Sequence, residues 1–505
     1  MTPRLNSRAV LRHTTGYLAA ISLSGALGAV RGFLNARWLG PELYGFWSSL
    51  AFFMSFGAHL HFGVREAVTK EIPMCRGQGR NDEARIRTQV AFTFFAAMLL
   101  AASAAFWLFA WQLPAQTSAL QRIGWWVAGV VLPLEILSVF EQTVTRAEER
   151  FQHLRAALVL PTGISLLLTC WLVFSYGLAG FYVVAVLTPA LALWCLRRHA
   201  EYSWHPRWSW VRLRSMLAVG WPVLAMTLVF ESLRWIDRGL ILGCIGLQSF
   251  GYYGLGLMLM RLCFIVPDVV ASVMEPRLHF DYAAHRQAAG VREHVWFPLA
   301  ALAWVMPFGL ALLDLALPAV IQRWLPDYLP GLAAIRILVW SSVFMGLAYS
   351  TKSCLVALGE QRRALPIYGL AIAVNLAVSL GLLRRGWGLV GIAVGAAAAQ
   401  VICSAGLVLF VFRRLGWSWR QTAAKAVSLY APIAVLCGLT TALPAWVQQG
   451  ASHGAGRLWT AAPWLGVGAY GVAIGCATYQ RIRRVMHDRE PVLGAVPRPV
   501  LELSA

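Results

Sequence analysis

Charged residues are scarce in this sequence, and the shortage decides its class. Only 13% of the 505 residues are Asp, Glu, Lys or Arg, whereas a soluble protein carries about 25%. Hydrophobic residues make up 59% of the chain, and its mean hydropathy is +0.62. This composition excludes an ordinary soluble domain and predicts a membrane protein.

Several motifs of catalysis and metal binding are also absent. None of the nine cysteines forms a CxxC pair, so neither a zinc site nor a disulfide framework is expected. The sequence has no Walker loop, no HExxH and no Ser/His/Asp arrangement. No loop is long enough to fold as a separate catalytic domain, which argues against a polysaccharide polymerase, a ligase or a membrane-anchored glycosyltransferase. We therefore expect no enzyme activity, no cofactor and no metal.

Long apolar segments take the place of such motifs. Each is about 20 residues long, which is enough to cross a bilayer as a helix. The predicted fold is an all-α polytopic membrane protein of about fourteen transmembrane helices. The segments are 14–38, 44–63, 88–111, 123–145, 155–176, 178–196, 216–242, 250–273, 295–318, 333–357, 365–384, 388–412, 425–446 and 460–480.

The basic residues outnumber the acidic ones by 43 to 22, and they are unevenly placed. If the N-terminus and every second loop face the cytoplasm, the inside segments hold 31 basic residues and the outside loops hold 6. This bias follows the positive-inside rule and predicts both termini in the cytoplasm. The net charge of +21 therefore reports topology, and nucleic acid is not an expected partner.

A repeat divides the chain into two halves. The residues Leu39 to Trp47, LGPELYGFW, return more weakly 206 residues later as Ile245 to Tyr253, IGLQSFGYY. Each copy closes one apolar segment and opens the next, which indicates two six-helix lobes around a central cavity. The predicted organisation is an N-terminal lobe at 1–196, a cytoplasmic connection at 197–215, a C-terminal lobe at 216–412, two additional spans at 413–480 and a cytoplasmic tail at 481–505. The loops 76–89 and 275–294 occupy matching places in the two lobes.

Ionisable residues within the spans are the candidate functional groups, because each costs about 2.5–3.5 kcal/mol to insert at the bilayer centre. The seventh span is the richest in them. Glu231, Arg234 and Arg238 are spaced to share one helical face, and Asp237 is one residue off it. Such a cluster either lines a polar cavity or forms a self-neutralised knot between packed helices.

Other spans contribute single polar groups. Arg31 and Asn35 share a face of the first span, although Arg31 could instead extend to the membrane surface. Arg261 lies near mid-depth in the eighth span and is expected to face the cavity. Glu135 in the fourth span needs a partner from another helix and has either a coupling role or an ion pair with Arg31 or Arg261. Asn375 in the eleventh span is a candidate for ligand contact or for interhelical hydrogen bonding.

The residues Arg37 to Gly45, RWLGPELYG, resemble the LGPexYG signature after the first span of bacterial polysaccharide flippases. These are the Wzx-type, lipid-linked-oligosaccharide branch of a superfamily that also contains multidrug exporters. Residues 234–253, 323–338 and 359–375 are similar to the same proteins. One departure is Gln248, where the second copy of the turn is expected to hold an acid.

The resemblance implies a flippase of the bacterial inner membrane. Its substrate would be a polyprenyl-diphosphate-linked glycan for O-antigen, capsule or exopolysaccharide, and its partners would be membrane lipid, a polysaccharide polymerase and other assembly proteins. The cavity arginines would bind the diphosphate. Two alternatives stay open, a cation-coupled multidrug or small-solute antiporter of the same fold and a non-transporting assembly factor.

Overall fold

The computed structural model of the chain is helical and contains no strand among the residues that it describes. Ten helical stretches in this part of the chain are long and apolar enough to cross a membrane, which confirms the polytopic all-helical class. The count of fourteen spans stays a prediction. Most of the predicted span 460–480, most of the loop 275–294, residues 199–204 of the connection and the tail 481–505 lie outside the described residues. The described residues are 7–148, 150–198, 205–268, 270–271, 292–358, 360–450 and 466–471.

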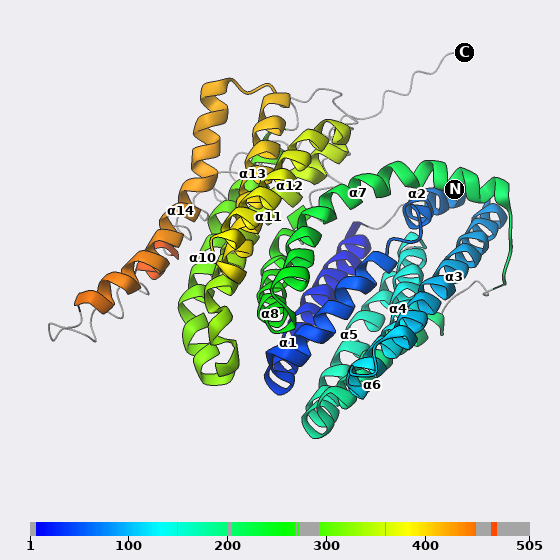
Figure 1. The fold of residues 1–505 in the computed structure, drawn as a ribbon. Helices are drawn as coiled ribbons and strands as arrows, with labels where there is room; N and C mark the ends of the chain where they lie inside the picture. The colour runs from blue at the N-terminus through cyan, green and yellow to red at the C-terminus, as the bar shows by residue number, and fades with distance from the viewer. Residues whose placement is uncertain are drawn as a thin grey trace, which may run out of the picture.

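The helices follow the predicted apolar segments in chain order (Figure 1). Several begin or end a few residues outside those segments, because their polar ends extend beyond the apolar stretch. The longer elements are α1 (Ser7–Gly57), α2 (Val64–Gly77), α3 (Asn81–Gln112), α4 (Ala119–Ala147), α5 (Phe151–Leu168), α6 (Phe174–Arg197), α7 (Trp210–Cys244), α8 (Leu247–Cys263), α10 (Arg292–Trp324), α11 (Leu332–Ala357), α12 (Leu365–Arg384), α13 (Gly388–Arg414) and α14 (Trp419–Gly450).

Glycine makes the turn in both copies of the repeat. Gly40 interrupts α1 with φ 70° and ψ 172°, and Pro41 follows it. Gly246 precedes α8 with φ 118° and ψ 179°. Positive φ values of this kind favour glycine, since a Cβ atom would be strained there. Two positions 206 residues apart therefore adopt the same type of backbone conformation, which the sequence repeat predicts.

The two copies also contact each other reciprocally. A Cβ atom on Gly45 would collide with the carbonyl oxygen of Leu247, and one on Gly251 would collide with that of Pro41. Pro41 and Leu247 are equivalent positions in the repeat, as are Gly45 and Gly251. Exchanging the copies therefore reproduces the contact, as a local two-fold axis between α1 and α8 requires. Superposition of the complete halves stays a prediction.

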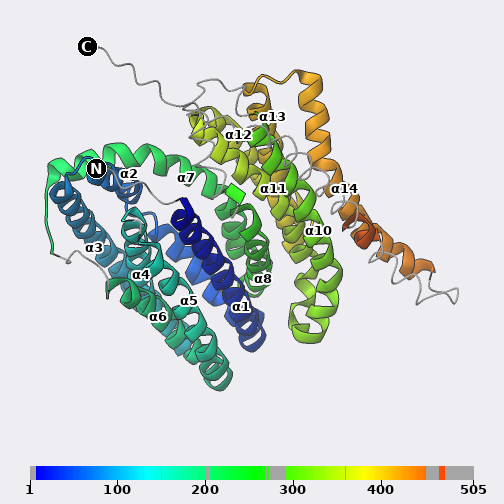
Figure 2. The ribbon, with the colours of Figure 1, turned by 180° about the vertical axis from the view of Figure 1, so that it is seen from behind.

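Helices α2–α6 gather on one side of the molecule and α10–α13 on the other, with α1 and α8 between them (Figures 1 and 2). Helix α7 belongs to both groups. Its residues Leu213 and Met216 are buried in the apolar core of α2–α4, whereas Phe230 is buried in the core of α10–α13. The first turns of α7 thus pack with the N-terminal lobe, on both sides of the boundary predicted at residue 216.

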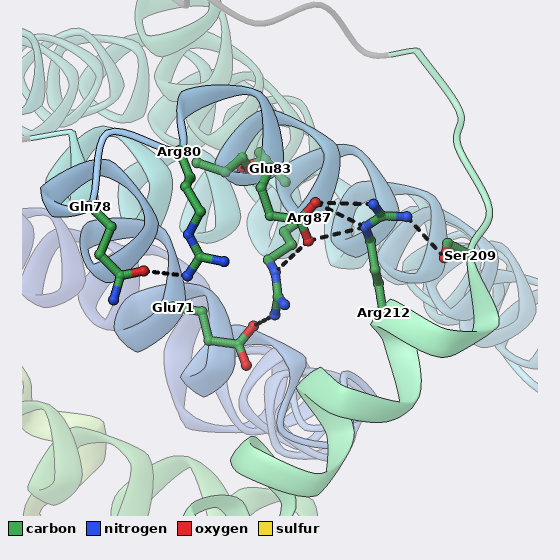
Figure 3. Close-up of polar contacts among 9 residues, drawn as sticks. Glu71, Gln78, Arg80, Glu83, Arg87, Ser209 and Arg212 are labelled. Carbon is green, nitrogen blue, oxygen red and sulfur yellow. Dashed lines mark hydrogen bonds and ion pairs between the residues drawn. The ribbon is translucent and has the colours of Figure 1, made fainter.

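An ion-pair network fixes the start of α7 to this lobe (Figure 3). The Glu83 carboxylate on α3 accepts hydrogen bonds from Arg212 Nε at 3.1 Å and Arg212 Nη2 at 3.0 Å. It also accepts one from Arg87 Nε at 3.0 Å, and Arg87 in turn pairs with Glu71 on α2. Three helices therefore meet in one charged network. We call this end of the bundle the basic end, and the opposite end, with the glycine turn at Gly40, the Gly40 end.

Candidate functional site

A cavity of about 800 Å³ lies between α1, α4, α5 and α6 on one side and α7 and α8 on the other. Its wall runs from Tyr44 and Trp47, near the Gly40 end, to Gln142 and Ala192, near the basic-end termini of α4 and α6. Small residues such as Gly28 contribute to the wall of α1 and leave room inside. The cavity therefore extends over much of the length of the bundle.

The fourth helix presents a polar face to this cavity. Glu135, Ser138 and Gln142 line it from α4 and are spaced three and four residues apart, so they lie on one side of the helix. The Glu135 residue is exposed, although it sits in the middle of an apolar helix. A carboxylate at this depth faces polar space rather than lipid, as intramembrane charges generally do.

Arg31 reaches into the cavity from α1 and is held by hydroxyl groups. Its Nη1 atom donates to Ser165 Oγ on α5 at 2.8 Å and to Thr188 Oγ1 on α6 at 3.3 Å. Hydroxyls orient a guanidinium without neutralising it, because they carry no net charge. Arg31 lines the cavity together with Arg261, as expected for a residue that faces polar space within the bundle.

The charged groups form two sets. Electrostatic interactions connect Arg31 with Arg261 and with Glu135. Arg234 and Arg238 lie four residues apart on α7 and also line the cavity. In the described part of the chain, neither Arg238 nor Arg261 makes an ion pair. Two cationic subsites therefore face one space.

The α7 subsite contains unsatisfied donors. Arg234 Nη1 donates to Glu231 Oε2 at 3.4 Å, which partly neutralises it. The Nε atoms of Arg234 and Arg238 are buried and have no hydrogen-bond partner. Buried donors are rarely left unpaired, and those that are often mark a place for water, an ion or a ligand.

Three candidates from the sequence, Asp237, Glu231 and Asn375, lie outside the cavity wall. Asp237 is buried and accepts hydrogen bonds from the Tyr253 hydroxyl and, at 3.0 Å, from the Arg238 backbone N–H. Consecutive residues on a helix point about 100° apart, so Asp237 turns toward α8 while Arg238 faces the cavity. Glu231 lies outside the wall and contacts Arg234.

Asn375 has a structural environment in α12. Its Nδ2 atom donates to the Leu233 carbonyl of α7 at 3.2 Å, and its Oδ1 accepts from Ser379 Oγ at 3.1 Å. It therefore bonds two helices together and does not line the cavity. Asn35 does line the cavity, and its buried Oδ1 atom has no partner.

Sequence reasoning missed the residues that orient Arg31. Ser165 and Thr188 are single hydroxyls within apolar spans, where such residues usually bond to their own helix backbone. Their signal was weak, since nothing in the sequence shows which helix they face. Among the described residues, no group of three or more His, Cys, Asp or Glu side chains lies close enough together to hold a metal ion.

Comparisons with known proteins agree with this architecture. Residues 34–323, more than half of the chain, match a family described as polysaccharide biosynthesis protein. A probable multidrug resistance protein NorM from Xylella fastidiosa is 22% identical over 266 residues, which cover 49% of this chain and 54% of that protein. The chain thus spans about half the length of the curated relatives it matches.

Two solved structures show the same fold. One is the inward-facing conformation of a multidrug resistance MATE family transporter of the MOP superfamily, with TM-score 0.62, 13% identity and coverage of 79% of this chain and 98% of that one. The other is a MOP superfamily transporter from Pyrococcus furiosus, in which the reverse polarity of the binding pocket suggests a different function. Its TM-score is 0.57, with 14% identity and coverage of 80% and 95%. The chain belongs to the polysaccharide biosynthesis protein family, and it has the fold of these solved membrane transporters.

Proposed function

We propose that this transporter moves a polyprenyl-diphosphate-linked oligosaccharide from the cytoplasmic to the periplasmic leaflet of the inner membrane, for surface polysaccharide synthesis. The observation that supports this proposal is the charge of the cavity wall. In the described part of the chain, one carboxylate, Glu135, and four arginines line it, the arginines being Arg31, Arg234, Arg238 and Arg261. A wall with this balance attracts an anion and repels a cation.

The diphosphate group fits the chemistry of these side chains. A guanidinium offers a planar fork of donors that bonds two phosphate oxygens at once, and it stays charged at any physiological pH. Arg238 and Arg261 are available for such contacts, since neither makes an ion pair within the described residues. A volume of about 800 Å³ accommodates the diphosphate and the sugars next to it.

The lipid tail needs a separate apolar path. A second cavity of about 460 Å³ lies between α1, α5 and α8 and shares Arg31 and Arg261 with the first. Its wall includes the apolar side chains of Ile21, Leu158 and Ile265. An amphiphile with its diphosphate at the shared arginines could place the start of its tail in this second cavity.

A drug or small-solute antiporter is the second candidate. The aromatic residues Trp47, Phe52 and Phe250 line the cavity beside Glu135, and such walls suit organic cations. The relatives named as multidrug transporters also favour this candidate. The third alternative, an assembly factor without transport, would need arginines that are held in contact ion pairs, which neither Arg238 nor Arg261 makes among the described residues.

A binding experiment separates the first two candidates. The purified protein in nanodiscs is titrated with undecaprenyl-diphosphate-N-acetylglucosamine and, separately, with the cation ethidium. We expect binding of the glycolipid, and a loss of about ten- to a hundredfold in affinity for Arg261→Ala, because a charged contact contributes on the order of 1.5–3 kcal/mol. Arg385→Ala is the matched control, since Arg385 is exposed and outside the cavity. Tight ethidium binding without glycolipid binding would establish the antiporter instead.

A further inference from the structure

Among the residues that the structure describes, Glu135 is the one acidic side chain in the wall of the main cavity, and a charge within a membrane span is costly. It is exposed to the cavity, and the charges that act on it are those of Arg261 and Arg31. No contact ion pair joins it to either arginine in the described structure. The carboxylate therefore shares the cavity with two cations without forming a contact ion pair with either.

The other groups around Glu135 carry no opposing charge. From α5 and α6 the cavity wall receives the neutral hydroxyls of Thr162 and Thr188. The Ser165 and Thr188 hydroxyls bond Arg31. From α4 itself, Ser138 and Gln142 share its face and are neutral. The α7 arginines also line the cavity, but they are not among the charges that act on Glu135. Glu135 thus responds to Arg31, to Arg261 and to whatever binds them.

The charge balance at this subsite changes when an anion enters. In the empty cavity, burial opposes the ionisation of Glu135 and the two cations favour it, and an ionised Glu135 reduces their net charge. A diphosphate bound between Arg31 and Arg261 uses the same cations and adds two negative charges beside the carboxylate. The carboxylate then loses its attraction and gains a repulsion, and both effects favour its protonated form.

We propose that Glu135 is the internal counter-ion of the Arg31–Arg261 pair, which an entering anion displaces and which takes up a proton as the anion binds. This inference rests on the proposed anionic substrate and names the group that links substrate binding to protons. The linkage is reciprocal, since a proton on Glu135 strengthens anion binding by the same factor by which the anion strengthens proton binding.

The test measures protons taken up on binding. Undecaprenyl-diphosphate-N-acetylglucosamine is titrated into the full-length protein in nanodiscs by calorimetry, at about pH 6, 7 and 8, in buffers of different ionisation enthalpy. A diphosphate esterified at both ends stays doubly ionised over this range, so any proton uptake belongs to the protein. We expect the wild-type protein to take up a proton and to bind more weakly as pH rises, by up to about tenfold per pH unit.

The variants assign that proton to one residue. Glu135→Gln should bind the glycolipid with no proton uptake, with an affinity independent of pH and at least equal to that of the wild type at about pH 8. Glu42→Gln is the matched control, because Glu42 is exposed near the glycine turn and outside the cavity. It should take up protons as the wild type does.

Three outcomes overturn the inference. The first is wild-type binding without proton uptake, which needs no variant and so does not depend on how the variant folds. The second is unchanged proton uptake in a folded Glu135→Gln protein. The third is a wild-type protein that does not bind the glycolipid at all, which removes the proposed function and the inference with it. The first two leave the proposed function intact, so the two failures are distinguishable.

Discussion

At the scale of single residues, the cavity uses arginine where lysine would also supply charge. Arg31 is oriented by Ser165 and Thr188, whose hydroxyls fit the fixed geometry of a guanidinium. A lysine at the same place keeps the charge but loses the planar fork that bonds two oxygens of a phosphate. For the proposed diphosphate substrate, we therefore expect the planar shape of the guanidinium to contribute to binding separately from its charge.

This distinction predicts the effects of substitution in cells. Arg261→Ala should abolish or strongly reduce glycan export in a flippase-deficient strain, while Arg261→Lys should restore only part of it. Arg31→Ala should behave in the same way as Arg261→Ala. Surface glycan is measured by gel staining, and membrane abundance by immunoblot, with Arg385→Ala as the control. Full export by both alanine variants at normal abundance would rule out a substrate site that is built from these arginines.

Gly45 and Gly251 give a second prediction at this scale. Alanine at either position would place Cβ against a backbone carbonyl oxygen of the facing helix, so α1 and α8 would have to separate. We expect each substitution to destabilise the protein by about 1–3 kcal/mol, as overpacking usually does. Gly243→Ala is the control, because a Cβ there meets nothing within 4 Å. Thermal unfolding in detergent measures the difference, and equal melting temperatures for all three would contradict the close contact.

The identity of the cavity arginines was predictable from the cost of charges in a membrane, but their partners were not. The spacing of Glu231, Arg234 and Arg238 places them on one face, yet only the two arginines line the cavity. The sequence gives relative angles around a helix and does not give the rotation of that helix toward its neighbours. For that reason Asn375 and Asp237 could not be placed before the structure was known.

At the scale of elements, α7 joins the two cores, and the charged network at its start can be tested directly. The ion pair of Arg212 and Glu83 is partly exposed, at 34% and 24% of the side chains, so its contribution is modest. We expect Glu83→Gln and Arg212→Gln to lower stability individually and to couple by about 0.5–1 kcal/mol in a double-mutant cycle. The stability of each variant is measured by unfolding the protein in mixed micelles with increasing amounts of denaturant.

The control for that cycle is Arg214→Gln. Arg214 lies two residues further along α7 and is exposed, so its coupling to Glu83 should be within error of zero. A coupling energy of zero for the Glu83–Arg212 pair as well would mean that apolar burial of Leu213 and Met216 alone holds this part of α7.

The double membership of α7 was not predictable from hydropathy. The apolar segment begins at residue 216, and a boundary drawn there follows composition alone. The structure shows that Leu213 and Met216 bury their side chains with α2–α4 before the helix crosses to the other lobe. Burial against a particular partner depends on tertiary packing, and the local sequence carries little information about it.

At the scale of the whole molecule, the distribution of basic residues predicts the orientation in the membrane. The excess of basic residues predicts that the basic end faces the cytoplasm. Reporter fusions after Arg87, Arg214 and Arg420 should all report a cytoplasmic location. A fusion after Arg385 should report the periplasm and serves as the opposite-side control. A periplasmic signal at any of the first three positions would overturn the topology.

The reciprocal glycine contact has a consequence for how such a chain can arise. Two copies of one six-helix half could meet through the same surface, because each equivalent position already contacts its counterpart in the other copy. The cavity does not share that symmetry. At the same offset of 206 residues, Arg234 and Arg238 correspond to Gly28 and Gly32. Gene duplication would therefore preserve the joint between the halves, while the two halves diverge in the charges that they present to the substrate.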